Sequence, residues 1–226
     1  MSVKVAIIDS AIGPGMIAAM DSRIAMRLAE DGSVRRTQGG DAEALSHGAA
    51  VARLILRRAP RCALLSAEVF YAGRPTAARV VAAAIEWCAA QGARVINLSL
   101  GLHSDRRMLR EACLAAISQG VLLVASLPAR GAATYPAIYP GVLAVNGDIR
   151  CGEEDHSCIE QDFLYGACPL PPDGFPGGGA SYAAARMSGM AAAFFHIHTA
   201  ATATDFINHL LETALFHGRE HRQAAK

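Results

Sequence analysis

The feature that most constrains the fold of this chain is an alternation of short apolar runs with longer amphipathic segments. The apolar runs lie at residues 3–9, 62–70, 93–100, 121–126 and 141–147, and the amphipathic segments at 48–58, 76–92 and 104–120. Strands that are apolar along nearly their whole length, separated by helices, indicate a parallel sheet buried on both faces. We therefore expect an α/β fold with three layers, in which helices cover both faces of a mostly parallel central sheet.

The rest of the chain is less regular. Pro, Gly, Cys and acidic residues mix between residues 148 and 179, which we expect to be mostly loop. Further helices are predicted at 180–196 and 202–217, and about 218–226 is expected to be a flexible tail. A chain of 226 residues, of which 52% are hydrophobic and 18% charged, is typical of one domain with a large core. We expect a single compact domain over residues 1–226.

Charge and hydropathy argue against two classes of partner. The formal net charge is +1 and no basic stripe is present, so we expect no nucleic-acid partner. No run approaches the ~20 apolar residues that a membrane span needs, so we expect no membrane segment. The first predicted strand begins at Val3, and no basic region followed by a long apolar run precedes it. We expect neither a signal peptide nor a prodomain, and a cytoplasmic location.

The six cysteines divide into two groups. Cys62, Cys88 and Cys113 lie in apolar patterns, where a free cysteine behaves as a small hydrophobic residue. The other three lie in the loop-like region, with spacings that fit no familiar zinc pattern: Cys151, Cys158 and Cys168. A reducing compartment favours free thiols for these as well, with a disulfide or a metal site as the alternatives.

Three polar residues stand where chemistry is expected. Asp9 ends the first strand, at the carboxyl edge where parallel sheets place their sites, while His47 and Ser181 each open a helix. Taken singly, each has an ordinary structural explanation, as a turn cap, a surface histidine or a helix N-cap. Together, an acid, a histidine and a serine can form a nucleophilic relay, in which the histidine accepts the serine proton and the carboxylate orients the imidazole. A helix N-terminus beside the serine adds free N–H groups near a developing oxyanion.

The segments around these residues resemble the motifs of the subtilisin-like serine proteases. "VAIIDSAIG" is similar to that family's aspartate motif, "SHGAAVARLI" to its histidine motif "HGTHVAG", and "GGASYAAARMSGMAA" to its serine motif, which begins "GTSMA". "IEWCAAQGARVINLSLG" and "YPAIYPGVLAVNG" resemble the family's substrate-lining strand and a later segment. The order Asp, His, Ser is also that of subtilisin. With five matches in family order from Val3 to about Ala193, the chain is identified as a member of this family.

The resemblance assigns roles residue by residue. It implies that Asp9 is the orienting acid, that His47 is the general base and then the general acid, and that Ser181 is the nucleophile. It also implies a segment that pairs with an extended substrate peptide as an added strand. The matching residues there are Ser99, Leu100 and Gly101. We expect no cofactor.

The oxyanion site departs from the family pattern. Ala129 falls where the family has its oxyanion asparagine, and Ala180 falls where it has a threonine beside the nucleophile. Arg130 and Asn97 are the candidate substitute donors. Three outcomes are open: a slow enzyme that uses backbone N–H groups alone, an enzyme with a substitute donor, or a site that only binds peptide. We favour activity because all three relay residues are present.

Other departures concern the helix after the nucleophile and the metal sites. Ala185 and Arg186 replace a proline and a histidine of the family motif, which we expect to alter the helix surface. Only about "RRAPR" separates the histidine helix from the next strand, so we expect the family's strongest calcium site to be missing. The histidines near the C-terminus lack a carboxylate or cysteine that would complete a ligand set, so no metal is predicted.

These departures favour a specialised protease. A weak oxyanion site and minimal loops indicate an enzyme that needs a particular substrate or partner to position the bond. The chain resembles small family members that remove leader peptides from modified peptides, one setting being maturation of the small crosslinked subunit of quinohemoprotein amine dehydrogenase. We expect a peptide or small-protein substrate, with a modifying enzyme that presents it as a further partner. The alternatives are a protein that binds an extended peptide without cleaving it, and an esterase.

Overall fold

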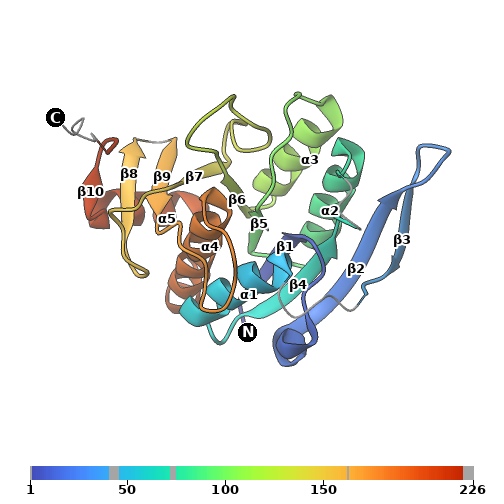
Figure 1. Ribbon diagram of the computed structural model, residues 1–226, viewed down its shortest axis with the longest axis horizontal. Coiled ribbons are helices and arrows are strands. Elements are labelled where there is room, and N and C mark those ends of the chain that lie inside the picture. The colour runs from blue at the N-terminus through green and yellow to red at the C-terminus, as the bar shows by residue number, and fades with distance from the viewer. Residues whose placement is uncertain (1, 41–45, 72–74, 162, 221–226) are drawn as a thin grey trace.

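The centre of the molecule is one twisted sheet (Figure 1). The computed structural model describes residues 2–40, 46–71, 75–161 and 163–220. Five parallel strands form the middle of the sheet in the order β7-β6-β5-β1-β4. Their bounds are β1 (Lys4–Asp9), β4 (Ala63–Glu68), β5 (Val95–Leu98), β6 (Leu122–Ser126) and β7 (Leu143–Gly147). Each lies within one of the predicted apolar runs, so the parallel core of the sheet is confirmed.

Shorter strands extend the sheet at both edges. At one edge β2 (Met20–Leu28) runs parallel to β4, and β3 (Val34–Gln38) pairs antiparallel with β2. At the other edge β9 (Leu164–Ala167) runs parallel to β7 and pairs antiparallel with β8 (His156–Glu160). The last strand, β10 (Phe216–His217), adds to β8 in parallel. In the described part of the chain the sheet therefore has ten strands.

Helices cover both faces of the sheet, as the strand pattern predicts. One core contains side chains of α1 (His47–Arg58), α4 (Ala180–Ile197) and α5 (Ala203–Thr213), and the other contains those of α2 (Ala78–Ala90) and α3 (Arg107–Ser118). Successive residues of a strand point to opposite faces, so along β1 Val5 and Ile7 enter the first core while Ala6 and Ile8 enter the second. A short 3₁₀ helix at Pro14–Ala19 follows β1. The three-layer architecture is confirmed.

Helix α4 runs through the first core and is built mainly from small residues. Most of its residues from Tyr182 to Ala192 are alanine, glycine or serine, and all of them are buried. At Gly189 an added Cβ would lie 2.9 Å from the Cβ of Arg58 and 3.1 Å from the carbonyl oxygen of Ile55, so this helix and α1 pack too closely for a side chain there. This close packing fixes the height and rotation of α4 relative to the sheet.

The second half of the chain differs from the sequence predictions at two places. Residues 148–179 are mostly loop, as predicted, but they also contain β8 and β9, which the sequence did not predict. These strands are short and mix polar with apolar residues, and they form because β7 offers a free edge, which no local pattern reveals. The helix predicted at 202–217 ends at Thr213, after which the chain extends to pair with β8.

Gly218, the first residue of the predicted tail, is hydrogen-bonded to strand β8 and to Arg150. The N–H of Gly218 donates to the carbonyl of Cys158 at 2.9 Å, and the guanidinium of Arg150 donates to the carbonyl of Gly218 at 2.7 Å. Residues 221–226 of the predicted tail lie outside the described residues. No helix in the described ranges is long and apolar enough to cross a membrane.

All six cysteines are buried, and the structure gives them as free thiols. Burial raises the pKa of Cys62 to about 11 and the pKa values of Cys113 and Cys151 to about 12. Burial also raises the pKa of Cys88. A thiol with so high a pKa carries almost no thiolate at neutral pH, so these four side chains act as packing residues.

The sequence suggested that Arg186 alters the surface of the helix. This expectation was wrong, because the Arg186 side chain is buried. It is only 3% exposed, and its guanidinium donates to the carbonyls of Cys168 at 3.1 Å and Leu170 at 2.6 Å. Its second terminal nitrogen lies 3.7 Å from a carboxylate oxygen of Glu153. The sequence around Arg186 does not reveal this burial, because the carbonyls that accept its hydrogen bonds belong to a different part of the chain. Arg186 thus fastens the segment around Pro169 to helix α4.

We predict that Arg186→Met lowers the free energy of unfolding by about 2–4 kcal/mol, because it leaves the buried carbonyl of Cys168 and the partly buried carbonyl of Leu170 without their charged donor. Arg57→Met is the matched control, since Arg57 pairs with the same Glu153 but its side chain is 53% exposed. That variant should lose less than ~1 kcal/mol. Urea unfolding of both variants measures the difference, and equal losses would contradict a structural role for Arg186.

Candidate active site

Asp9 lies at the carboxyl end of β1, in the middle of the sheet, and is 1% exposed. One of its carboxylate oxygens accepts the N–H of Ser10 at 2.6 Å and the Ser10 hydroxyl at 3.1 Å. A buried carboxylate needs such donors, because burial without them is costly. The position of Asp9 follows directly from the sequence, since the four residues before it, Val5 to Ile8, are all apolar.

His47 is the first residue of helix α1. The side chain of Ser46 caps this helix by accepting the N–H of Ala49 at 3.1 Å, and its hydroxyl donates to the carbonyl of Ala11 at 2.8 Å. The cap thereby ties the start of α1 to the chain that follows Asp9. The Nδ1 atom of His47 lies 2.9 and 2.8 Å from the two carboxylate oxygens of Asp9.

The approach of α1 to this chain requires glycine after His47. An added Cβ on Gly48 would lie 2.3 Å from the carbonyl oxygen of Ser10, which no real contact allows. The N–H of Gly48 instead donates to the Ser10 hydroxyl at 3.0 Å. Ser10 and Gly48 are therefore part of the site, although the sequence analysis assigned them no role.

Two opposing effects act on the pKa of His47. Burial lowers it, but the hydrogen bond to Asp9 and the negative charge of Asp9 raise it, and the net direction is upward from the ordinary value of 6.5. Because the folded-state pKa is raised, the pair stabilises the fold fully below pH 6.5, and this contribution is lost as the pH rises through the folded-state pKa.

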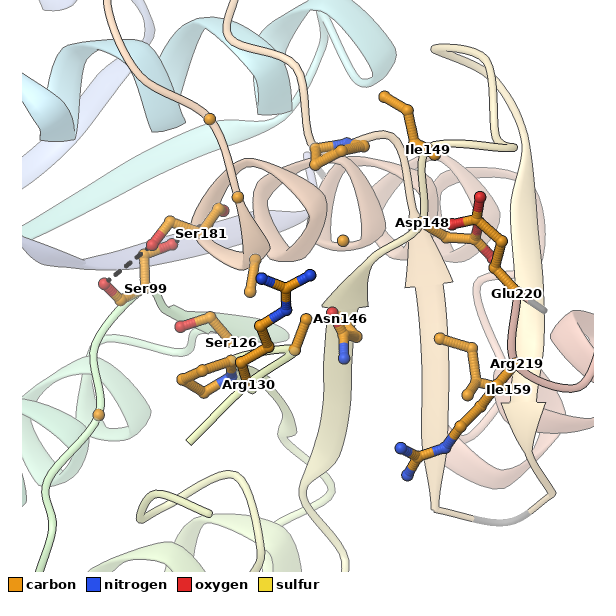
Figure 2. Close-up of a pocket in the computed structure, with 18 of the residues that line it drawn as sticks. Ser99, Ser126, Arg130, Asn146, Asp148, Ile149, Ile159, Ser181, Arg219 and Glu220 are labelled. Atoms are coloured by element: carbon orange, nitrogen blue, oxygen red, sulfur yellow. Dashed lines mark hydrogen bonds between the residues drawn. The ribbon is translucent and has the colours of Figure 1, made fainter. Parts of the chain in front are cut away.

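Ser181 lies in the first turn of helix α4. The preceding Gly179 has φ 126°, which favours glycine, and its N–H donates to the carbonyl of Pro169 at 2.8 Å. The hydroxyl of Ser181 donates to the carbonyl of Ser99 at 3.5 Å, which is a weak hydrogen bond (Figure 2). The described residues include no hydrogen bond from Ser181 to His47, so the relay is closed between Asp9 and His47 and open at the serine.

A cleft of about 970 Å³ opens beside Ser181. Its walls come from the ends of β5, β6 and β7, from the start of α4 and from Arg219 and Glu220, the last residues that the structure describes (Figure 2). All three residues of the predicted substrate-binding segment line it: Ser99, Leu100 and Gly101. An added Cβ on Gly101 would lie 2.6 Å from the hydroxyl oxygen of Thr134, so the chain and its neighbour are in close contact there.

The predicted oxyanion residues separate into two groups. Ala129, Arg130 and Ala180 line the cleft, and the Arg130 side chain projects into it from the loop after β6 (Figure 2). Asn97 was a wrong candidate, because it is fully buried and does not line the cleft. The sequence could not show this, since the partners of its side chain lie on another element.

Asn97 instead joins β5 to helix α4. Its amide nitrogen donates to the hydroxyl of Ser188 at 3.0 Å, and its amide oxygen accepts the hydroxyl of Ser99 at 2.9 Å. Ser99 lies 3.2 Å from the carbonyl of Ser181 and Ser188 donates to the carbonyl of Ala184, so the network braces the helix that carries the nucleophile. Such a fully bonded buried network fixes one arrangement of its elements.

Two residues of the site were missed by the sequence analysis. Tyr182, next to the nucleophile, stacks on the ring of His47 with 5.6 Å between ring centroids and 24° between planes. Its sequence signal is the tyrosine at the place of the methionine in "GTSMA". Asn146 lines the cleft, and its side-chain oxygen is buried with no hydrogen-bond partner among the described residues. No group of three His, Cys, Asp or Glu side chains in the described ranges is arranged to hold a metal ion.

Fold and site together define a class: an α/β protein that brings an aspartate, a histidine and a serine, in that chain order, to the carboxyl edge of a parallel sheet. A family model described as "Peptidase_S8: Subtilase family" matches residues 1–157, which is more than half of the chain. The chain belongs to the subtilase family. The matched residues include Asp9 and His47 but end before Ser181, so that serine rests on its motif and its place in the structure.

Curated relatives match part of the chain. Subtilisin BL from Lederbergia lenta is 38% identical over 93 residues, which are 40% of this chain and 35% of that protein. An alkaline protease from Alkalihalobacillus alcalophilus is 37% identical over 93 residues, which are 40% of this chain and 24% of that protein. The matched part is therefore well under two thirds of these relatives' own length.

Solved structures match nearly the whole chain. The prenylagaramide maturation protease PagA superposes with a TM-score of 0.71 at 22% identity, covering 93% of this chain and 82% of that one. The protease domain of PatA superposes with a TM-score of 0.72 at 22% identity, covering 94% of this chain and 87% of that one. At this identity the likeness establishes the fold.

We predict that Asp9→Asn lowers the pKa of His47 below 6.5, because burial of the imidazole then acts without the opposing charge. A proton NMR titration of the imidazole measures this change. His156, whose pKa is lowered by burial and which contacts the carbonyl of Leu210 at 2.9 Å, serves as the internal control and should titrate as before. An unchanged His47 titration would show that Asp9 does not act on this imidazole.

Proposed function

We propose that this protein is a serine endopeptidase that cleaves a peptide bond through an acyl-enzyme. The observation that carries the proposal is the bonded pair of Asp9 and His47 beside a serine at the N-terminus of a helix, at the mouth of a cleft. A buried carboxylate on Nδ1 fixes the tautomer in which Nε2 is free to accept a proton. Peptide binding alone does not require the relay. The same relay also cleaves esters, but the segment Ser99 to Gly101 along the cleft favours an extended peptide over a small ester.

The reaction begins when Ser181 releases its weak bond to Ser99 and turns toward His47. Nε2 of His47 takes the hydroxyl proton while the serine oxygen bonds to the substrate carbonyl carbon. The same nitrogen returns the proton to the leaving amine, which gives the acyl-enzyme. Water then attacks the ester with His47 again acting as base, and Ser181 is regenerated.

The oxyanion is stabilised mainly by backbone groups. Gly179 provides no side-chain cap, so the N–H groups of Ala180 and Ser181 in the first turn of α4 keep no intrahelical acceptor. Ala129 offers no side-chain donor where the family has asparagine. Removing that asparagine from subtilisin itself lowers turnover about 10²–10³-fold, so we expect slow turnover here.

We further propose that the substrate is a specific peptide from which a leader is removed. Ser99 to Gly101 line the cleft, where an extended peptide can pair with them as an added strand. A slow enzyme also gains from a substrate that is held in position. PagA, which shares the fold, is described as a maturation protease. A partner that modifies the peptide and presents it to the cleft fits the same proposal, and so does a cytoplasmic location.

We predict that a fluorophosphonate reagent modifies Ser181, because His47 activates this hydroxyl. Mass spectrometry of the labelled protein identifies the site. Ser181→Ala should remain unlabelled, while Ser126→Ala, which removes another serine of the same cleft, should label as the unaltered protein does. Failure to label Ser181, both alone and with a candidate peptide present, would favour the peptide-binding alternative.

Arg130 allows a prediction about the substrate. Its guanidinium lies in the cleft that holds Ser181, so a substrate residue bound there with a carboxylate gains a charge-assisted hydrogen bond (Figure 2). We expect a preference of about tenfold in kcat/KM for glutamate over glutamine at that substrate residue. Arg130→Gln should abolish the preference, whereas Arg219→Gln, a matched change at the far end of the cleft, should retain most of it.

The same experiment separates the two roles of Arg130. If Arg130 serves as the substitute oxyanion donor, Arg130→Gln lowers kcat for glutamate and glutamine substrates equally. That outcome would contradict the specificity role. The measurement is steady-state kinetics on a matched pair of peptides.

A further inference from the structure

We propose that Tyr182 is a positioning residue for His47: its ring fixes the plane of the imidazole and stabilises the imidazolium that forms during the reaction. This proposal rests on the proposed function and deepens it, because it concerns the same site. It gives a role to the residue that follows Ser181, which is not one of the three residues of the relay.

The geometry of the two rings supports this role. Their centroids are 5.6 Å apart and their planes differ by 24°, which is a stacked arrangement. The hydrogen bond to Asp9 fixes the direction of Nδ1, but it leaves the imidazole ring free to rotate about the Cβ–Cγ bond of His47. A flat surface against one face removes this freedom. The His47 side chain is 40% exposed, so a large part of the ring is not enclosed by the protein.

Tyr182 is itself held on two sides. It is 6% exposed, its hydroxyl donates to the carbonyl of Pro176 at 2.9 Å, and its N–H donates to the carbonyl of Gly179 at 3.1 Å. The ring therefore moves with the first turn of α4, which also carries Ser181. Stacking thus ties the position of the base to the position of the nucleophile.

The groups that face His47 come from two elements. Among the described residues, Asp9 at the end of β1 is the charged group that shifts the pKa of His47, and Tyr182 on α4 is the titratable group stacked on it. The first turn of α1 contains no acidic residue. Burial, and then the charge of Asp9, raise the pKa of Tyr182, so its ring stays neutral and presents an electron-rich face to the imidazolium.

The test compares Tyr182→Met with Tyr182→Phe. Methionine stands at this place in the family motif, so the fold accommodates it, while phenylalanine keeps the ring and loses only the bond to Pro176. In a Ser181→Ala background, proton NMR measures the pKa of His47 without any turnover. We expect Tyr182→Met to lower this pKa by about half a unit to one unit, and Tyr182→Phe to leave it within about 0.2 units.

Kinetics with Ser181 present give the second readout. The acid limb of the kcat/KM profile should move to lower pH in Tyr182→Met by the same amount as the NMR pKa. At the plateau kcat should fall about fivefold while KM changes less than twofold, since the ring acts on the imidazolium of the transition state. Tyr182→Phe should match the unaltered protein in both respects.

The outcomes distinguish this proposal from the proposed function. An unchanged pKa of His47 in Tyr182→Met would overturn the positioning role, whether or not the protein cleaves peptides. An equal effect of methionine and phenylalanine would also overturn it, because the hydroxyl tether and not the ring would then be responsible. A shifted pKa in a protein without peptidase activity would support the role of Tyr182 and contradict the proposed function. Tyr182→Leu provides a second ring-free variant.

Discussion

The close packing of helix α4 against α1 and the sheet is the constraint on which the rest of the structure depends. Small residues allow the helix to run through the core, and Gly189 admits the backbone of α1 where any side chain would clash. The tip of this helix carries Ser181, and the start of α1 carries His47. A shift of either helix would separate the two residues, so the distance between base and nucleophile is set by packing far from the cleft.

Buried polar side chains then fix the orientation of each part. Asn97 braces α4 against β5, Arg186 fastens the segment around Pro169 to the same helix, and Ser10 holds both Asp9 and Gly48. Each of these side chains has at least one hydrogen-bond partner in a different part of the chain. Because an unpaired buried polar group is costly, the bonds hold only in one arrangement of those elements. Hydrogen bonds thus hold Asp9 and His47 in one arrangement, while a cleft opens beside Ser181.

The site offers few side-chain hydrogen-bond donors for the negative charge that would develop on a substrate carbonyl oxygen. Ala129 and Ala180 remove two side-chain donors, and Asn97 is occupied inside the core. Backbone N–H groups at the start of α4 remain, together with a cation, Arg130, in the cleft. A site of this kind binds and orients better than it accelerates. Such a site is compatible with the proposed role of a protease for one specific peptide.

The sequence by itself determined the layered α/β fold and placed Asp9, His47 and Ser181, because apolar runs, glycines and helix starts are local signals. It also singled out Ser99 to Gly101, which line the cleft. The tertiary structure alone decided the rest: the edge strands β8 and β9, the burial of Arg186, the internal role of Asn97 and the stacking of Tyr182 on His47. The physical reason is that each of these depends on partners distant in sequence, and hydrogen bonds and ring contacts between distant segments leave no periodic trace in the chain.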